Sequence, residues 1–158
     1  MKLSTKSRYG VRALFDLAYN SGSLPTQVQD ISRRQDISPR YLEQIFQNLK
    51  KAGILTSKRG PKGGYTLARK PEEISIRDIL LATEGESLFV DCIVVGDGRR
   101  KRKPECGLNG CCVTQTIWSD ANNLMTEHFG TVTLKDLCER AQAMGLKREV
   151  DNRMMYFI

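Results

Sequence analysis

Length, composition and charge exclude several classes of protein. The chain has 158 residues, 40% of them hydrophobic and 27% charged, which is typical of a soluble globular domain. No apolar run reaches the roughly 18 residues of a membrane span, and the N-terminus lacks the apolar stretch of a signal peptide, so we expect a cytoplasmic protein without membrane contact. The net charge is +7, and residues 1–70 alone carry +10. This concentration favours a polyanionic partner, with a merely solvated basic face as the alternative.

The first part of the chain predicts two helices. Apolar residues recur at helical spacing over residues 6–20. Thr26 and Gln29 then form a capping-box pattern, which predicts that a short second helix begins there. We expect Val28 and Ile31 to face inward from this second helix.

A third helix is predicted from residue 39 onward. Ser38 is a favourable cap, Pro39 suits the first helical position, and Gly53 is a natural stop. The apolar residues that repeat at intervals of three and four are Leu42, Ile45, Phe46 and Leu49. The polar residues of the opposite side are Arg40, Glu43, Gln44, Gln47, Lys50 and Lys51. Two short helices joined by a tight turn, the second polar on one side, indicate a helix-turn-helix.

A β-hairpin with a basic tip follows directly. Residues 54–58 and 65–68 read as short strands, and the glycine-rich residues 59–64 read as the turn between them. A hairpin in this place forms the wing of a winged helix-turn-helix. Ser75 and Asp78 then cap a further helix that ends near residue 85. We therefore assign residues 1–85 to a DNA-binding domain.

The second half of the chain predicts a dimerisation element. Residues 86–112 are irregular and contain four of the five cysteines, and residues 113–129 form a long helix. The apolar side of that helix is wider than one small domain covers, so we expect a partner helix from a second chain. Dimerisation and C-terminal helices span 113–145, with a tail over 146–158. The expected fold is mainly α with a small β-hairpin wing.

The third helix and the wing together favour duplex DNA. The major groove accepts a helix, and there Gln44 suits adenine, Arg40 suits guanine or phosphate, and Glu43 suits a cytosine amine. Arg59 and Lys62 suit the minor groove or phosphates. Each residue alone reads as a solvated charge, but the set in this order favours DNA. The predicted DNA-binding residues are Arg8, Ser38, Arg40, Tyr41, Glu43, Gln44, Gln47, Lys58, Arg59 and Lys62.

Three segments carry a family resemblance. Residues 2–10, 41–44 and 59–65 resemble, in this order and spacing, the Rrf2 family of winged-helix repressors, which includes IscR, NsrR, RirA and CymR. The resemblance extends over nearly the whole chain. It implies a homodimer on an imperfect palindrome of double-stranded DNA. It also implies that Glu43, Gln44 and Arg59 help to read bases, with Arg59 in the minor groove.

The cysteines suggest a sensor. Four of them fall within 21 positions, which in a cytosolic protein indicates a metal or redox site more often than disulfides. Many family members carry an iron–sulfur cluster on three cysteines. The resemblance therefore implies a [2Fe-2S] or [4Fe-4S] cluster, and the implied ligands are Cys92, Cys106 and Cys112, with Cys111 as the alternative to Cys112. The spacer after Cys92 is longer than in the family pattern, and Gln115 stands where the family has a ligating histidine.

Other functions stay open at this point. The cysteines also fit thiol–disulfide sensing without a cluster, or no sensing role, and Cys138 reads as packing. A cofactor-free repressor of the CymR type, controlled by a protein partner or by thiol oxidation, is the main alternative. An electron carrier or cluster-transfer protein would need no DNA-reading surface. We expect no enzyme, because no phosphate loop, metalloprotease motif or nucleophile–histidine pair is found, and His128 is the only histidine.

Overall fold

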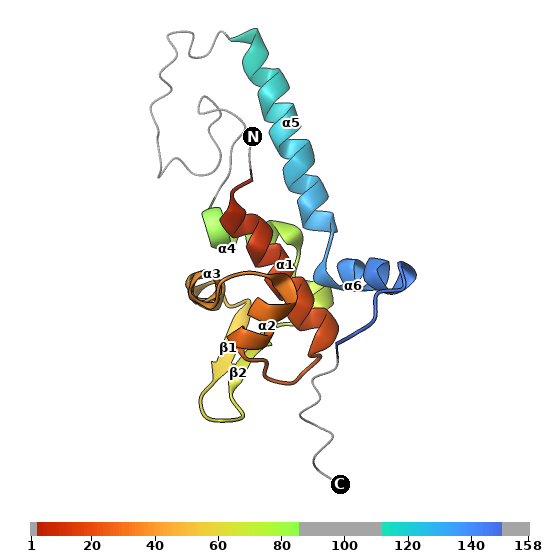
Figure 1. Ribbon diagram of the computed structural model, residues 1–158. Helices are drawn as coiled ribbons and strands as arrows, with labels where there is room; N and C mark the ends of the chain where they lie inside the picture. Colours follow the sequence, from red (N-terminus) through yellow and green to blue (C-terminus); the bar gives the residue numbers. More distant parts are fainter. Residues whose placement is uncertain (1–2, 86–111, 150–158) are drawn as a thin grey trace.

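The computed structural model describes residues 3–85 and 112–149. In these ranges the chain forms six α-helices, one short 3-10 helix and a two-stranded antiparallel sheet. In chain order the elements are α1 (Thr5–Asn20), α2 (Val28–Gln35), α3 (Pro39–Lys51), β1 (Leu55–Lys58), β2 (Gly64–Leu67), η1 (Pro71–Glu73), α4 (Ile76–Glu84), α5 (Val113–Thr131) and α6 (Leu134–Ala143). Figure 1 shows α1 to α4 and the hairpin gathered into one body from which α5 projects. The predicted winged helix-turn-helix fold with a long additional helix is confirmed.

The helix ends follow the capping rules in most places. Ser38 accepts a hydrogen bond from the Tyr41 amide and Pro39 is the first residue of α3, as the sequence predicts. The capping boxes at Ser75 and Thr133 are both formed and open α4 and α6. These contacts satisfy backbone N–H groups that the first turn of a helix leaves without partners.

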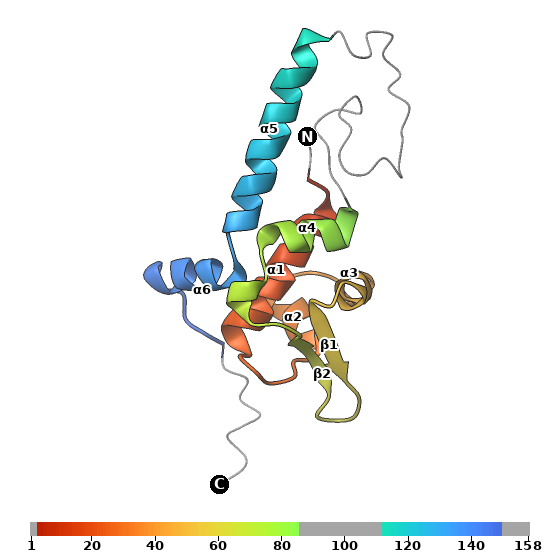
Figure 2. The same cartoon turned by 180° about the vertical axis from the view of Figure 1, so that it is seen from behind.

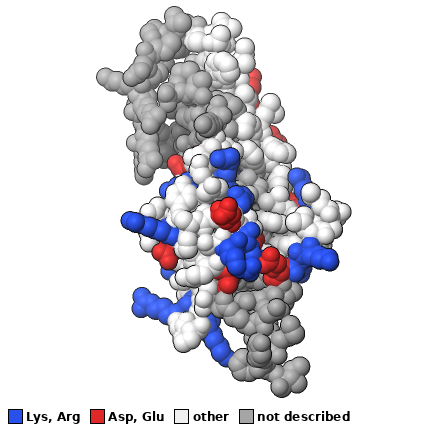
Figure 3. Space-filling view, viewed as in Figure 1, with Lys and Arg blue, Asp and Glu red and all other residues white. Residues whose placement is uncertain are grey.

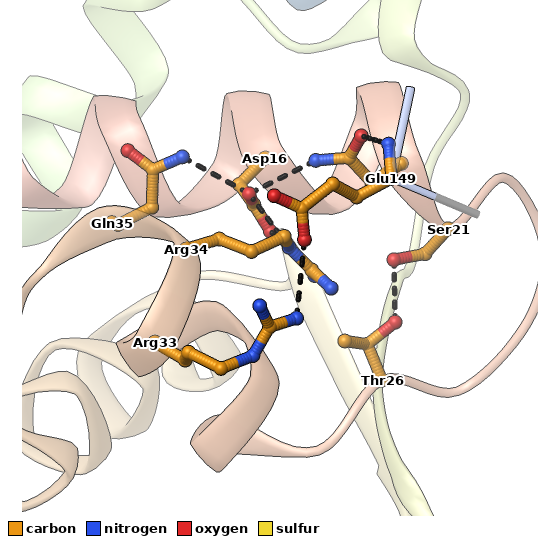
Figure 4. Close-up of polar contacts among 8 residues, drawn as sticks. Asp16, Ser21, Thr26, Arg33, Arg34, Gln35 and Glu149 are labelled. Carbon is orange, nitrogen blue, oxygen red and sulfur yellow. Dashed lines mark hydrogen bonds and ion pairs between the residues drawn. The ribbon is translucent and has the colours of Figure 1, made fainter. Parts of the chain in front are cut away.

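The predicted capping box at Thr26 is wrong. The cap residue of α2 is Gln27, whose side chain makes no capping bond. Thr26 is buried instead, and its hydroxyl donates to the Ser21 hydroxyl (Figure 4). Its backbone pairs with Tyr65 of β2 through N–H···O distances of 3.0 and 2.8 Å. Thr26 therefore pairs with a distant strand instead of capping α2, the role that the local spacing predicts.

One hydrophobic core joins both halves of the chain. The inward residues of α1, α2 and α3, including Leu14, Ile31 and Phe46, are fully buried. Ile79 of α4 and Leu134 of α6 lie in the same core. Backbone bonds from Ile76 to Val132 and from Leu134 to Ile74, at 2.8 and 3.0 Å, hold the starts of α4 and α6 together. The base of α5 is thereby fixed on the DNA-binding body.

The α5 helix extends away from this body, as Figures 1 and 2 show from opposite sides. Only part of its length packs on α4. In the single chain the side chains of Val113, Ile117 and Leu124 are 83%, 60% and 67% exposed, and Trp118 is 43% exposed. Among the helices of the described residues, none has the length and apolar character to cross a membrane.

The residues after α6 return to the body. The Tyr19 hydroxyl donates to the Leu146 carbonyl at 2.6 Å, and the Arg148 guanidinium lies 5.1 Å from the centre of the Tyr19 ring. The Glu149 carboxylate pairs with Arg33 at 3.1 Å, as Figure 4 shows. The first four residues of the expected tail thus lie against α1 and α2, and the remainder is outside the described residues.

Candidate nucleic-acid interface

The polar side of α3 faces solvent. Leu42, Ile45, Phe46 and Leu49 are all buried, and this fixes the rotation of the helix about its axis. The exposed residues of the opposite side are Arg40, Glu43, Gln44 and Gln47. A rigid helix that presents flexible polar groups in this way has the form that fits the major groove.

The wing is held against α3 by side chains. β1 and β2 pair antiparallel, with Lys58 opposite Gly64. The Tyr65 ring packs on Phe46 at a centroid distance of 4.7 Å and an interplanar angle of 63°. On the other strand, the Lys50 ammonium donates to the Ser57 hydroxyl at 2.7 Å. These two contacts hold the wing against α3, and Lys50 has a hydrogen-bond partner within the chain.

The basic tip of the wing is accessible. Lys58, Arg59 and Lys62 are exposed around the turn. The Gln27 amide donates to the Pro61 carbonyl at 3.4 Å and links the tip to the start of α2. Burial raises the pKa of the Tyr65 hydroxyl, and the nearby Glu43 carboxylate raises it further. Glu43 is thus the acidic group beside an otherwise basic wing.

Three of the predicted contact residues are placed differently from the others. The Ser38 hydroxyl already caps α3, and the half-buried Tyr41 ring meets the Tyr9 ring edge-on at 5.9 Å. Arg8 is exposed on α1 rather than on α3 or the wing. Eight of the ten predicted residues therefore lie on α3 and the wing, and seven of these are exposed, whereas Tyr41 packs on Tyr9 and Ser38 caps α3.

Charge separates this surface from α5. In Figure 3, Lys and Arg side chains project from the side where α3 lies and from the lower end where the wing lies. The visible surface of α5 is mostly white with a few acidic groups, and the sequence of α5 contains no Lys or Arg. The basic surface suits a polyanion, whereas the apolar surface of α5 suits another protein surface.

Of the predicted cluster ligands, only Cys112 lies within the described residues. It is the residue before the first turn of α5, and its sulfur lies 3.1 Å from the Thr114 hydroxyl. That hydrogen bond, assisted by the Gln115 amide, lowers the pKa of the Cys112 thiol. Burial raises the pKa of the Cys138 thiol, in keeping with a packing role. Cys92, Cys106 and Cys111 lie outside the described residues, and within those residues no group of three His, Cys, Asp or Glu side chains could hold a metal ion.

The end of α4, from which the cysteine segment continues, is fastened to the start of α1. The Ser4 amide donates to the Glu84 carboxylate at 2.8 Å, and the buried Ser7 and Thr83 hydroxyls lie 2.8 Å apart. Burial raises the pKa of Glu84, but the hydrogen bonds from Ser4 and Ser7 outweigh it, so the pKa lies below the usual value. The chain therefore enters residues 86–111 from a helix end that is tied to the start of α1.

A polar network around Asp16 was missed by sequence reasoning. Asp16 is fully buried on α1 and binds Arg34 and Gln35 of α2. The available signal was a carboxylate on the apolar side of α1, between Leu14 and Leu17. Nothing local indicates its partners, because Arg34 is 18 residues away in sequence.

The described fold and this surface define a winged helix-turn-helix protein of the DNA-binding type. A model of the Rrf2 family, described as an iron-dependent transcriptional regulator, matches residues 3–140. The chain therefore belongs to the Rrf2 family of transcriptional regulators, which is a non-enzymatic family.

Individual relatives agree with this assignment. Protein rrf2 of Nitratidesulfovibrio vulgaris is 40% identical over 141 residues, which cover 89% of each chain. The solved structure of T. potens IscR superimposes with a TM-score of 0.71 at 32% identity, over 99% of this chain and 97% of that one. CymR, the global cysteine regulator of B. subtilis, gives a TM-score of 0.69 at 29% identity, over 89% of this chain and 98% of that one.

Proposed function

We propose that this Rrf2-type regulator is a cytoplasmic homodimer that represses transcription by binding an imperfect palindrome in double-stranded DNA. The observation that carries the proposal is the exposed polar side of α3, fixed beside a basic wing by the Tyr65–Phe46 contact at 4.7 Å. In a symmetric dimer two such surfaces meet two half-sites about one helical turn apart. The bound dimer represses transcription because it excludes other proteins from the same stretch of DNA.

Within each half-site we assign base reading to α3 and the wing. Gln44 pairs with adenine, Glu43 accepts from a cytosine amine, and Arg40 contacts guanine or phosphate. Arg59 enters the minor groove beside the recognition helix. Lys58 and Lys62 contribute charge toward the phosphates, which sets affinity more than sequence preference.

Base reading is tested with duplexes enriched by the purified protein from a random library. Gln44→Ala should lose preference at one position per half-site, by about 1–3 kcal/mol. Arg59→Ala should lower affinity for the enriched duplex. The matched control is Arg77→Ala, which removes an equal charge from an exposed position on α4 and should bind as wild type. Wild-type binding by both Gln44→Ala and Arg59→Ala would exclude this surface.

We further propose that the regulator senses iron–sulfur or redox status through Cys92, Cys106 and Cys112, with Cys111 as the alternative ligand. Support comes from the family model's iron dependence and from the lowered pKa of the Cys112 thiol, since thiolates bind iron–sulfur clusters. An iron–sulfur cluster, when bound, supplies a centre that responds to oxidants and iron supply. Cys112 precedes α5 directly, so chemistry at its sulfur acts at the start of the proposed dimer helix.

The alternative is a cofactor-free repressor controlled by thiol oxidation or by a protein partner. The likeness to CymR over 89% of this chain favours it. Anaerobic purification separates the two, through the absorbance spectrum and assays for iron and sulfide. Cys112→Ala should lose iron, whereas the half-buried Cys138→Ala should keep it. A colourless wild-type protein without iron would favour the alternative, and retention of iron by Cys112→Ala but not Cys111→Ala would move the ligand to Cys111.

A further inference from the structure

The end of α2 is held by a buried carboxylate. Asp16 of α1 is fully buried, and the Arg34 side chain is 6% exposed. Arg34 donates from Nε to both carboxylate oxygens at 3.0 Å and from Nη2 to Oδ2 at 2.7 Å. The Gln35 amide donates to Oδ1 at 3.0 Å, and Figure 4 shows both α2 residues directed at Asp16. The last two residues of α2 are therefore anchored to α1 through the buried Asp16 carboxylate.

The exposed Arg12 side chain also binds Gln35. Arg12 lies one turn before Asp16 on α1 and is exposed. Its Nε donates to Gln35 Oε1 at 3.3 Å, and its Nη2 donates to the Gln35 carbonyl oxygen. Carbonyls at the end of a helix lack helical partners, and a cation there also meets the negative end of the helix dipole. We call Arg12, Asp16 and Gln35 the turn clamp.

The turn clamp reaches the first turn of α3 as well. The Arg12 guanidinium lies 5.4 Å from the centre of the Tyr9 ring. The Tyr9 and Tyr41 rings pack edge-to-face, with 5.9 Å between their centroids. Between Gln35 and α3 the chain turns through Asp36, which adopts a left-handed conformation with φ of 51°. Arg12 thus contacts Gln35, the last residue before the turn. It also contacts Tyr9, whose ring packs on Tyr41 after the turn.

We propose that Arg12 is a positioning residue for the recognition helix: its forked guanidinium clamps the α2–α3 turn and so sets the angle at which α3 enters the groove. This inference rests on the proposed reading of DNA by α3. The alternative role for an exposed arginine of a DNA-binding protein is a phosphate contact. The two roles differ chemically. A lysine can take the place of an arginine that contacts a phosphate as a point charge, but it does not reproduce the planar, forked set of donors of a guanidinium.

The first test uses the free protein. Arg12→Met and Arg12→Lys should both speed hydrogen exchange of the Ile37 and Leu42 amides by about tenfold. The Ile37 amide bonds to the Ser32 carbonyl of α2, and the Leu42 amide bonds to the carbonyl of Ser38, which precedes α3. Amides of α4 and α6 should keep their protection. Arg8→Met is the matched control, because it removes the same charge one turn away on α1 without touching the clamp. Unchanged exchange in both Arg12 variants would overturn the proposal.

The second test uses two DNA probes, a duplex enriched from a random library by the wild-type protein and a scrambled duplex of the same composition. Both Arg12 variants should bind the enriched duplex about tenfold more weakly, because base contacts are misaligned, and the scrambled duplex within about twofold of wild type. Arg8→Met should weaken both probes alike. Wild-type binding by Arg12→Lys, with an equal loss on both probes for Arg12→Met, would assign a phosphate contact and overturn the proposal.

The two experiments also separate this inference from the function on which it rests. If the wild-type protein enriches no duplex, the proposed function is refuted. The part of the inference that does not involve DNA, the clamping of the α2–α3 turn by Arg12, is then decided by the exchange of the Ile37 and Leu42 amides alone.

Discussion

Single carboxylates serve two different purposes in this molecule. Asp16 is buried and paired with Arg34, and removal of either partner would leave a charge without compensation in the interior. Such a loss costs about 3–5 kcal/mol, whereas the intact pair adds little net stability over apolar residues. The pair joins the end of α2 to α1. Asp136 lies at the surface and caps a helix instead.

The cap at Asp136 predicts a definite pH dependence. Hydrogen bonds from the Thr133 amide and hydroxyl hold the pKa of Asp136 below its usual value. A lowered folded-state pKa means that the stabilisation is complete above the unfolded pKa, about 3.9, and is lost as pH falls through the folded value. Asp136→Asn should therefore lower the free energy of unfolding at pH 7, and this cost should vanish in strong acid.

Urea denaturation from pH 7 down to pH 2.5 measures this difference. The control is Glu139→Gln on the same helix, since its pairing with Lys135 at 3.9 Å is exposed and adds little. A cost of Asp136→Asn that does not change with pH would contradict the capping role.

At the scale of elements, the wing depends on a close backbone approach. Gly64 lies against the loop before α2, where an added Cβ would come within 2.4 Å of the Thr26 carbonyl oxygen. Thr26 also forms a backbone bridge with the next residue of β2, Tyr65, and that bridge joins the strand to the loop. Packing of the wing on α3 through Tyr65 therefore requires glycine at position 64, because any side chain would push the strand away.

Gly64→Ala should destabilise the protein by more than about 2 kcal/mol, since the clash is with backbone that cannot move alone. Gly53→Ala is the matched control: its φ is 69° but nothing lies within 4 Å of an added Cβ, so only the left-handed conformation is penalised, by about 1 kcal/mol. Chemical denaturation gives both values. Equal costs for the two substitutions would show that close approach is not the limiting factor.

At the scale of the whole molecule, the exposed apolar surface of α5 supports the proposed homodimer. Val113, Ile117 and Leu124 occupy one side of a helix that stands away from its own body (Figure 2). Contiguous apolar surfaces of this kind are interaction sites. A twofold arrangement buries the same residues from both chains, and so a single substitution acts twice.

Leu124→Glu should weaken dimerisation by at least about a hundredfold, because two buried leucines contribute about 1.5–3 kcal/mol each. Asn123→Glu adds the same charge to an exposed neighbour on another side of the helix and should remain dimeric. Sedimentation equilibrium over a range of concentrations distinguishes the two variants. A monomeric wild type would refute the dimer, and a dimeric Leu124→Glu would place the interface elsewhere.

The sequence allowed most elements to be predicted where their signals are local. The caps at Ser38, Ser75 and Thr133 lie within three residues of the groups they bind, and the apolar repeat of α3 marks its buried side without reference to other elements. The exposed residues of the candidate interface followed from the same repeat. Their assignment to DNA bases stays a prediction.

Tertiary structure alone decided where distant residues meet. Thr26 has the spacing of a helix cap, but pairing with Tyr65 of β2 outweighs that local preference. Asp16 looks like an ordinary polar interruption of α1 until Arg34 and Gln35 are brought against it. The sequence by itself determined the elements, because helix and turn preferences act over a few residues. Only the folded chain determined the turn clamp and the fixed angle between α3 and the wing, because those contacts join residues that no local pattern relates.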